Sequence, residues 1–97
     1  MPKVTVNLPD DMSPYADELQ YFVETMIRKL HCNRHKGYTK DMNPMRLMDL
    51  AVREIKEAHD AKGQFEFFVE CADTANMAFL AAMCAIEMTR SEFDAMQ

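Results

Sequence analysis

Two pairs of acidic residues stand inside segments whose apolar residues recur with helical spacing. The first pair is Glu54 and Glu57, and the second is Glu70 and Asp73. Residues three apart on a helix lie on one face with Cβ atoms about 5–6 Å apart, so each pair directs two negative charges the same way. Unpaired buried charges are very costly. If the two helices pack together, the four acids converge. The fold then needs a partner that compensates their negative charge.

The apolar rhythm places the acids on the packing faces of two helices. In the first segment, steps of three and four run from Leu47 and Leu50 to Glu54, Glu57 and Ala61. In the second segment the same rhythm gives two parallel stripes, which are Cys84, Leu80, Met77, Asp73 and Glu70, and Phe65, Val69, Ala72, Asn76, Phe79 and Met83. Solvated charges belong on the opposite face of an amphipathic helix. If the two helices pack together, a hard divalent cation such as Mg²⁺ is the expected compensator.

An alternative places the acids in solvent, where the first pair flanks Arg53 and Lys56 as an ordinary charge run. One such spacing is common in helices. Two such pairs on consecutive helices, both on packing faces, favour a functional cluster.

The remaining pattern predicts one all-α domain, because 97 residues leave no room for two. Residues 3–8 alternate between apolar and polar side chains, which is typical of a short strand. The chain has no second strand candidate, and a strand must pair its backbone groups. We therefore expect an extended N-terminal arm over residues 1–12 that pairs with, or lies across, another copy, followed by a helical domain over residues 13–97.

Cap-and-proline signatures predict the helix starts. The first helix is expected to begin at Ser13 and Pro14 and to end between residues 30 and 36. The second is expected to begin at Asn43 and Pro44 and to end near residues 59–61.

The third helix is expected to run from about residue 64 to 88, followed by a short C-terminal helix after a weak capping box at Ser91. Aromatic residues occupy more than one side of this third helix, including Phe65, Phe68 and Phe79. An oligomeric helical bundle would bury the surplus apolar surface.

Composition excludes several classes of function. A net charge of −5 argues against a broad nucleic-acid-binding surface, and two glycines leave no glycine-rich phosphate loop. Three cysteines, an odd number, argue against a disulfide framework and suit a reducing cytoplasm. The most apolar stretch, residues 74–88, is too short to span a membrane. We expect a cytoplasmic protein with neither a nucleic-acid nor a membrane partner.

The order of three motifs adds a resemblance. The chain reads KLHCNRHKGY from Lys29, REIKE from Arg53 and ECADTAN from Glu70. Over about residues 26–85 it resembles the all-α nucleotide pyrophosphohydrolase superfamily, the MazG-like proteins, and especially their small stand-alone phage and bacterial versions. The resemblance implies helical dimers or tetramers in a bacterial or phage-infected cytoplasm. It also implies cleavage of nucleoside triphosphates (NTP or dNTP) to the monophosphate and pyrophosphate, with Mg²⁺ as cofactor and Mn²⁺ as an alternative.

The resemblance also implies roles for nine residues. The four acids Glu54, Glu57, Glu70 and Asp73 would be catalytic and would bind the metal, or one of them would orient the attacking water. Substrate-binding roles fall to Lys29, Asn33, Lys36, Arg53 and Asn76. Lysine offers a point charge to phosphate, and asparagine both donates and accepts. Asn76 could bond a ligand carboxylate, the sugar or a phosphate.

Two residues depart from the family pattern: Tyr38 stands in a loop that often carries a tryptophan, and Arg53 keeps two other functions open. Arg53 stands where these proteins often carry a further acid. An arginine there could weaken metal binding or bind phosphate instead. One alternative is a binding protein on the same scaffold that captures a nucleotide or a cyclic-nucleotide signal without cleaving it, a sponge. The other is a purely structural helical oligomer whose acids are salt-bridged to basic residues.

Overall fold

The computed structural model describes residues 1–96, and all of the regular structure in that range is helical. The elements in chain order are the 3-10 helix η1 (Asp10–Tyr15), α1 (Ala16–Cys32), the 3-10 helix η2 (Arg34–Lys36), α2 (Pro44–His59) and α3 (Gln64–Met96). No strand occurs in the described residues. The predicted all-α class and the three long helices are therefore confirmed.

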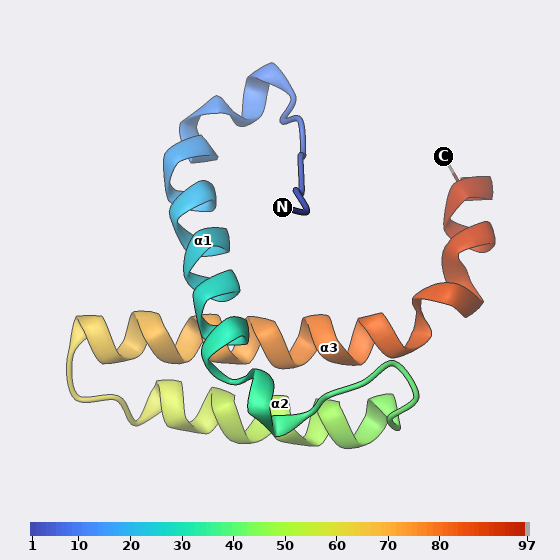
Figure 1. Ribbon diagram of the computed structural model, residues 1–97. Coiled ribbons are helices and arrows are strands. Elements are labelled where there is room, and N and C mark those ends of the chain that lie inside the picture. The colour runs from blue at the N-terminus through green and yellow to red at the C-terminus, as the bar shows by residue number, and fades with distance from the viewer. Residues whose placement is uncertain (97) are drawn as a thin grey trace.

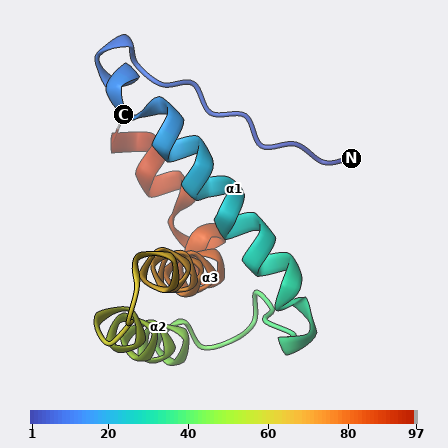
Figure 2. The same cartoon turned by 90° about the vertical axis from the view of Figure 1, so that its left-hand side faces the viewer.

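Helices α2 and α3 form an antiparallel hairpin, and α1 crosses α3 at a steep angle (Figures 1 and 2). The most extensive packing is between α2 and α3, and α1 packs on α3. The segment between α1 and α2 runs along one side of the hairpin, in front of it in Figure 1, and the end of α1 lies beside the middle of α3. This arrangement brings the end of α1 and the acids of the hairpin into one region.

Helix α2 begins where its local sequence predicts. The Asn43 side chain accepts a hydrogen bond of 2.9 Å from the backbone N–H of Met45, and Pro44 is the first helical residue. The cap satisfies a backbone donor that the helix leaves free, and proline has no N–H to satisfy. The helix ends at His59, within the predicted range.

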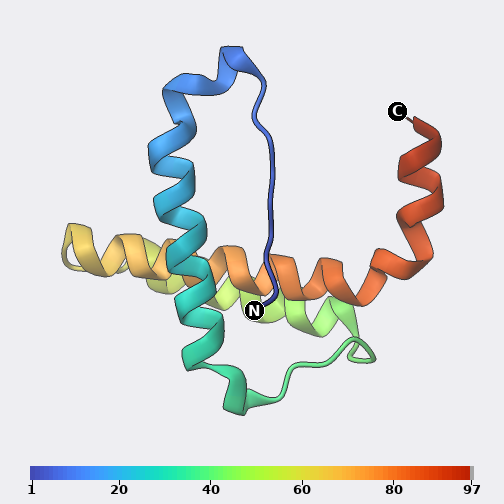
Figure 3. The same cartoon turned by 45° about the horizontal axis from the view of Figure 1, so that its top comes forward.

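The start of α1 differs from the prediction. Ser13 and Pro14 lie inside η1, and α1 begins after Tyr15, which makes no side-chain cap bond. The cap-and-proline signature therefore lies within a 3-10 turn. Residues 1–9 form neither helix nor strand in the single chain and run as an open arm (Figures 2 and 3). Pairing of this arm with another copy stays a prediction.

Helix α3 continues to Met96 without a break. The predicted short C-terminal helix is thus the last part of α3, where the ribbon bends away from the hairpin (Figure 1). No glycine or proline follows Gly63, and those are the residues that end helices most strongly. A weak capping box at Ser91 is not sufficient to interrupt the helix.

Small residues line the seam between α2 and α3. The core consists of Leu47, which is 0% exposed, together with Leu80 and Ala81. Further along the seam the buried residues are Ala51 and Ala58 from α2 and Ala72 from α3. Alanine lets two helix backbones approach closely, but it contributes little apolar area. The hairpin therefore holds its helices together with a narrow core.

Much apolar surface stays uncovered in the single chain. Its radius of gyration is 15.0 Å, whereas about 12.5 Å is expected for a compact domain of this length. Phe65 is 80% exposed, and Val52, Ile55 and Phe79 are also exposed. Phe65 and Phe79 belong to a stripe predicted to pack, and they lie outside the seam.

The apolar part of α3 is longer than the sequence pattern suggests. Gln64–Ile86, with a mean hydropathy of 1.3, is long and apolar enough to cross a membrane by length and composition alone. The core helix of a soluble protein passes the same test. In this chain the segment also carries Glu70 and Asp73 on the side that faces α2 and α1.

Candidate functional site

The seam of α2 contains one acid. Leu47, Ala51 and Ala58 are buried, and Glu54 continues the same steps of four, three and four, so it is half-buried between them. Successive residues turn by about 100° around a helix, which leaves Glu57 beside this row rather than in it. Glu57 is exposed. The sequence predicts both acids in or beside the apolar stripe, and in the structure Glu54 lies in the seam and Glu57 lies beside it.

Three of the four predicted metal ligands converge. Glu54, Glu57 and Glu70 each offer a carboxylate oxygen, and these oxygens lie within 4.8 Å of one another. Glu70 Oε2 is buried and has no hydrogen-bond partner. Asp73 is half-buried one turn beyond Glu70 on α3. Carboxylate oxygens are the ligands that Mg²⁺ takes in proteins, and a buried carboxylate oxygen without a hydrogen-bond partner fits a bound cation.

Crowding of the acids shifts their protonation. Burial, followed by the neighbouring Glu57, raises the pKa of Glu54 from 4.5 to about 7. Burial and the charge of Asp73 raise the pKa of Glu70. Burial also raises the pKa of Asp73, although Lys29 opposes the rise. The cluster therefore holds more protons near neutral pH than isolated acids would.

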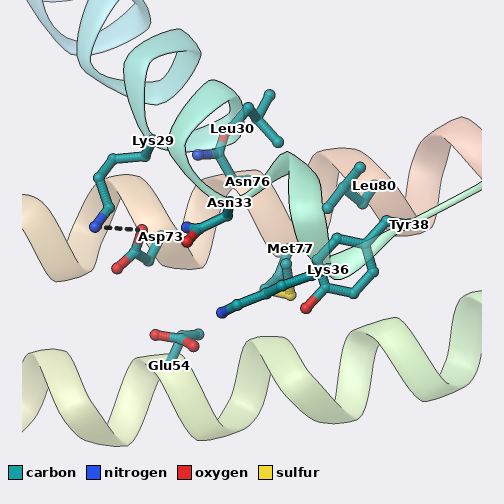
Figure 4. A pocket seen from close by; sticks show the side chains of 10 residues that line it. All are labelled: Lys29, Leu30, Asn33, Lys36, Tyr38, Glu54, Asp73, Asn76, Met77 and Leu80. Atoms are coloured by element: carbon teal, nitrogen blue, oxygen red, sulfur yellow. Dashed lines mark ion pairs between the residues drawn. The ribbon is translucent and has the colours of Figure 1, made fainter.

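A cavity opens beside the acids, between the end of α1, η2 and the hairpin (Figure 4). The residues that line it are Lys29, Leu30, Asn33, Lys36, Tyr38, Glu54, Asp73, Asn76, Met77 and Leu80. Lys29 Nζ lies 3.6 Å from Asp73 Oδ1, which ties α1 to α3 at the acidic end. The structure thus brings together four of the five predicted substrate-binding residues with two of the acids.

Asn76 is the one buried polar residue in the described part of the chain, at 3% exposed. Its Nδ2 donates a hydrogen bond of 2.9 Å to the backbone carbonyl of Met26 on α1. A carbonyl can only accept, so the amide nitrogen must face it and Oδ1 must lie on the other side. Oδ1 is buried without a donor, a state that costs about 1–3 kcal/mol.

The fifth predicted substrate-binding residue lies apart from the others. Arg53 is exposed and lines an open hollow on the far side of the acids, with Lys56, Glu57 and Glu70 among its neighbours. The acidic cluster therefore stands between two hollows, one with Lys29 and Lys36 and one with the basic residues of α2. Lys56 was not among the predicted site residues, because a lysine at a helix surface carries no signal by itself.

The apolar wall of the cavity is the part that sequence reasoning missed. Leu30, Tyr38, Met77 and Leu80 line it opposite the charged end. Leu30, Tyr38 and Met77 also pack against the Leu47 core, and helical periodicity assigns Leu30 and Met77 to the core alone. No local signal distinguishes a residue that only packs from one that packs and lines a cavity.

Comparison of the chain with protein-family models, with curated proteins and with solved structures gives no match. The chemistry of this site therefore has to be argued from its own residues.

Proposed function

We propose that the chain is a Mg²⁺-dependent nucleotide pyrophosphohydrolase that converts an NTP or dNTP to the monophosphate and pyrophosphate. The observation that carries this proposal is the convergence of Glu54, Glu57 and Glu70, with Glu70 Oε2 buried and without a hydrogen-bond partner. Beside it stands a cavity with an apolar end and with a charged end that holds both Lys29 and Asp73. A phosphate and a flat base need those two environments.

The three glutamates would hold the cation, with Asp73 beside them. Mg²⁺ supplies polarisation of a phosphate oxygen and a bound water of lowered pKa. Mn²⁺ prefers the same oxygen ligands. The cation would also offset the mutual repulsion that raises the pKa of Glu54, so its binding strengthens as pH rises through about 7.

The basic residues on both sides of the acids suit a charged chain of phosphates. Lys29 and Lys36 would meet the phosphate nearest the sugar, because they line the same cavity as the apolar wall. Arg53 and Lys56 line the opposite hollow and would meet the leaving pyrophosphate. Cations placed where negative charge develops lower the barrier to its transfer.

A second candidate function is capture of a nucleotide or cyclic-nucleotide signal without cleavage. Arg53 favours this function. It places a positive charge beside the acids, at a position where a further acid would instead strengthen metal binding. In this case ligands stabilise the fold and no pyrophosphate appears.

Pyrophosphate release from a panel of NTPs and dNTPs, with Mg²⁺ and with a chelator, separates the two functions. We expect release only with Mg²⁺, and a loss of about 100-fold in Glu70→Gln, the size typical of removing one electrostatic group from an active site. Glu18→Gln, an exposed acid on α1 that lines neither hollow, is the control and should keep the activity. Ligand-dependent stabilisation without release would establish the sponge instead.

The exposed apolar surface supports a homodimer or homotetramer as the working form in the cytoplasm. The expanded radius of gyration and the uncovered Phe65 and Phe79 leave α3 with a face that a second copy would bury. Light scattering of the purified chain gives the mass of the assembly. Deletion of residues 1–8 should lower that mass if the arm pairs between copies, and an unchanged mass would argue against such pairing.

A further inference from the structure

Helix α2 carries a second row of apolar residues, on a face that no other helix of the described chain covers. The row consists of Met45, Met48, Val52 and Ile55, whose exposed fractions run from 41% to 66%. Successive residues turn by about 100° around a helix, so this row lies roughly 110° around α2 from the buried row that begins at Leu47. In the described part of the chain α3 is the only helix that packs on α2, and Figure 2 shows α1 and α2 on different sides of α3. One apolar face of α2 therefore has no partner within that part of the chain.

The spacing of this row is typical of a two-helix coiled coil. Its steps of three, four and three residues match the two apolar positions of a heptad repeat, which face a partner helix along a continuous seam. A single exposed apolar residue is normal on a protein surface, whereas a contiguous apolar patch marks an interaction site. The row therefore indicates that α2 receives a second helix on this face.

Two charged residues beside the row identify the second helix and its direction. Asp49 and Lys56 are exposed, lie on the same flank of the row and occupy equivalent positions one heptad apart. One antiparallel arrangement of two copies of α2 packs Val52 beside Ile55 of the second copy. In that arrangement each Asp49 comes alongside Lys56 of the other copy, whereas a shift by one heptad would bring the two Asp49 side chains together. The other flank consists of alanines buried against α3, so a parallel pair has no such charge complement.

We propose that this row is an interface on which a second copy of the chain docks through its own α2, with the two helices antiparallel. The interface is separate from the exposed Phe65 and Phe79 of α3, and no nucleotide is needed to form it. Lys56 also lines the open hollow beside the acids, so Asp49 of the second copy stands at the rim of that hollow. Because α2 has 16 residues, the contact is small, and we expect a dissociation constant on the order of micromolar.

Sedimentation velocity of the full chain over a series of concentrations tests the interface. Val52→Glu places two carboxylates at the centre of the apolar contact and should halve the mass at a concentration where the unaltered chain is assembled. Arg46→Gln is the control, because it changes the net charge by the same one unit at an exposed position of α2 outside the row, and it should keep the mass. Circular dichroism checks that both variants keep the helicity of the unaltered chain. An unaltered chain that is monomeric throughout, or equal masses of the two variants, overturns the proposal.

A charge exchange tests the antiparallel direction. Asp49→Lys sets two positive charges beside each other on both sides of the contact centre and should weaken the self-association about tenfold, whereas adding Lys56→Asp should restore it. No weakening, or a weakening that the second substitution does not reverse, overturns the antiparallel pairing. Both substitutions are at exposed positions, so this test stands even if Val52→Glu does not fold.

Deletion of residues 1–8 separates this interface from one made by the N-terminal arm. The row of α2 is complete without the arm, so the deletion should leave the effect of Val52→Glu on the mass unchanged. If the deletion lowers the mass while Val52→Glu does not, the contact belongs to the arm and the proposal is overturned.

Discussion

The two sides of the cavity are built in different ways. The acidic side stands on α2 and α3, which pack along their length with Leu47 and four buried alanines in the seam. The other side comes from the end of α1 and from η2. Of the other two α-helices, α1 packs only on α3. The acidic side holds carboxylates of like charge close together on two closely packed helices. The other joins α3 by the ion pair of Lys29, the hydrogen bond from Asn76 and the stacking of aromatic rings of α1 on Phe68.

Because of this difference, we expect the hairpin to determine the stability of the fold and the α1 side to respond to a ligand. The hairpin can carry acids that repel one another because its buried core, not the acids, holds it together. The α1 side holds few of the buried residues, so it can yield to a ligand that fills the cavity at little cost. Each substitution changes one side of the cavity and leaves the other side unchanged for comparison.

The largest effect is expected from the hairpin core. Leu47→Ala removes a fully buried side chain and should lower the free energy of unfolding by about 2–5 kcal/mol, measured by urea denaturation. Met48→Ala, the exposed neighbour on the same helix, is the control and should change it by less than about 0.5 kcal/mol. Equal effects of the two variants would mean that the hairpin core is not the support of the acidic side.

Replacing an acid of the cluster should change the free energy of unfolding by a smaller amount and in the opposite direction. The folded pKa of Glu54, about 7, lies above its ordinary value of 4.5, so the folded chain holds the extra proton in that window. Stability without divalent ions should therefore fall as pH rises from about 4.5 to 7. Glu54→Gln should flatten this fall and raise the free energy of unfolding at pH 8 by about 1 kcal/mol, a value discounted for the solvent around a half-buried group.

The control for this prediction is Glu18→Gln, an exposed acid on α1. It should leave the pH profile unchanged, measured with a chelator present. A Glu54→Gln profile that still falls between pH 4.5 and 7 would assign the dependence to other groups.

The smallest effect is expected from the α1 side. Lys29→Met removes the 3.6 Å ion pair with Asp73 while keeping an apolar stem, and should cost about 0.5 kcal/mol of stability. The pKa of Asp73, which Lys29 lowers, should rise in this variant. Arg28→Met, an exposed neighbour, is the control in both urea denaturation and carboxyl titration by NMR. A loss as large as that of Leu47→Ala would show that α1 is part of the main support.

Features set by local chemistry were predictable from the sequence. Asn43 and Pro44 start α2 through their own side chains, and the long run without glycine or proline predicts a long α3. The convergence of the glutamates followed from their spacing, because two helices with acids on facing rows must bring them together.

Features set by packing angle were not predictable in the same way. The rotation of α2 about its axis puts Ala58 rather than Glu57 in the seam, and the steps of three and four allow both. The angle at which α1 crosses α3 decides that Lys29 and Asn76 share a cavity while Arg53 does not. Such angles depend on the whole set of packed side chains, not on any one segment.

Cys32 is a position at which a fluorescent label can report on the site. It is the last residue of α1, its thiol is free and exposed, and it directly precedes Asn33 at the cavity. The other two cysteines are half-buried, so a thiol-reactive dye under mild conditions should label Cys32 first. A dye at this end of α1 should change its emission when a ligand binds in the cavity, so that binding can be followed in real time without substituting any residue that lines the cavity.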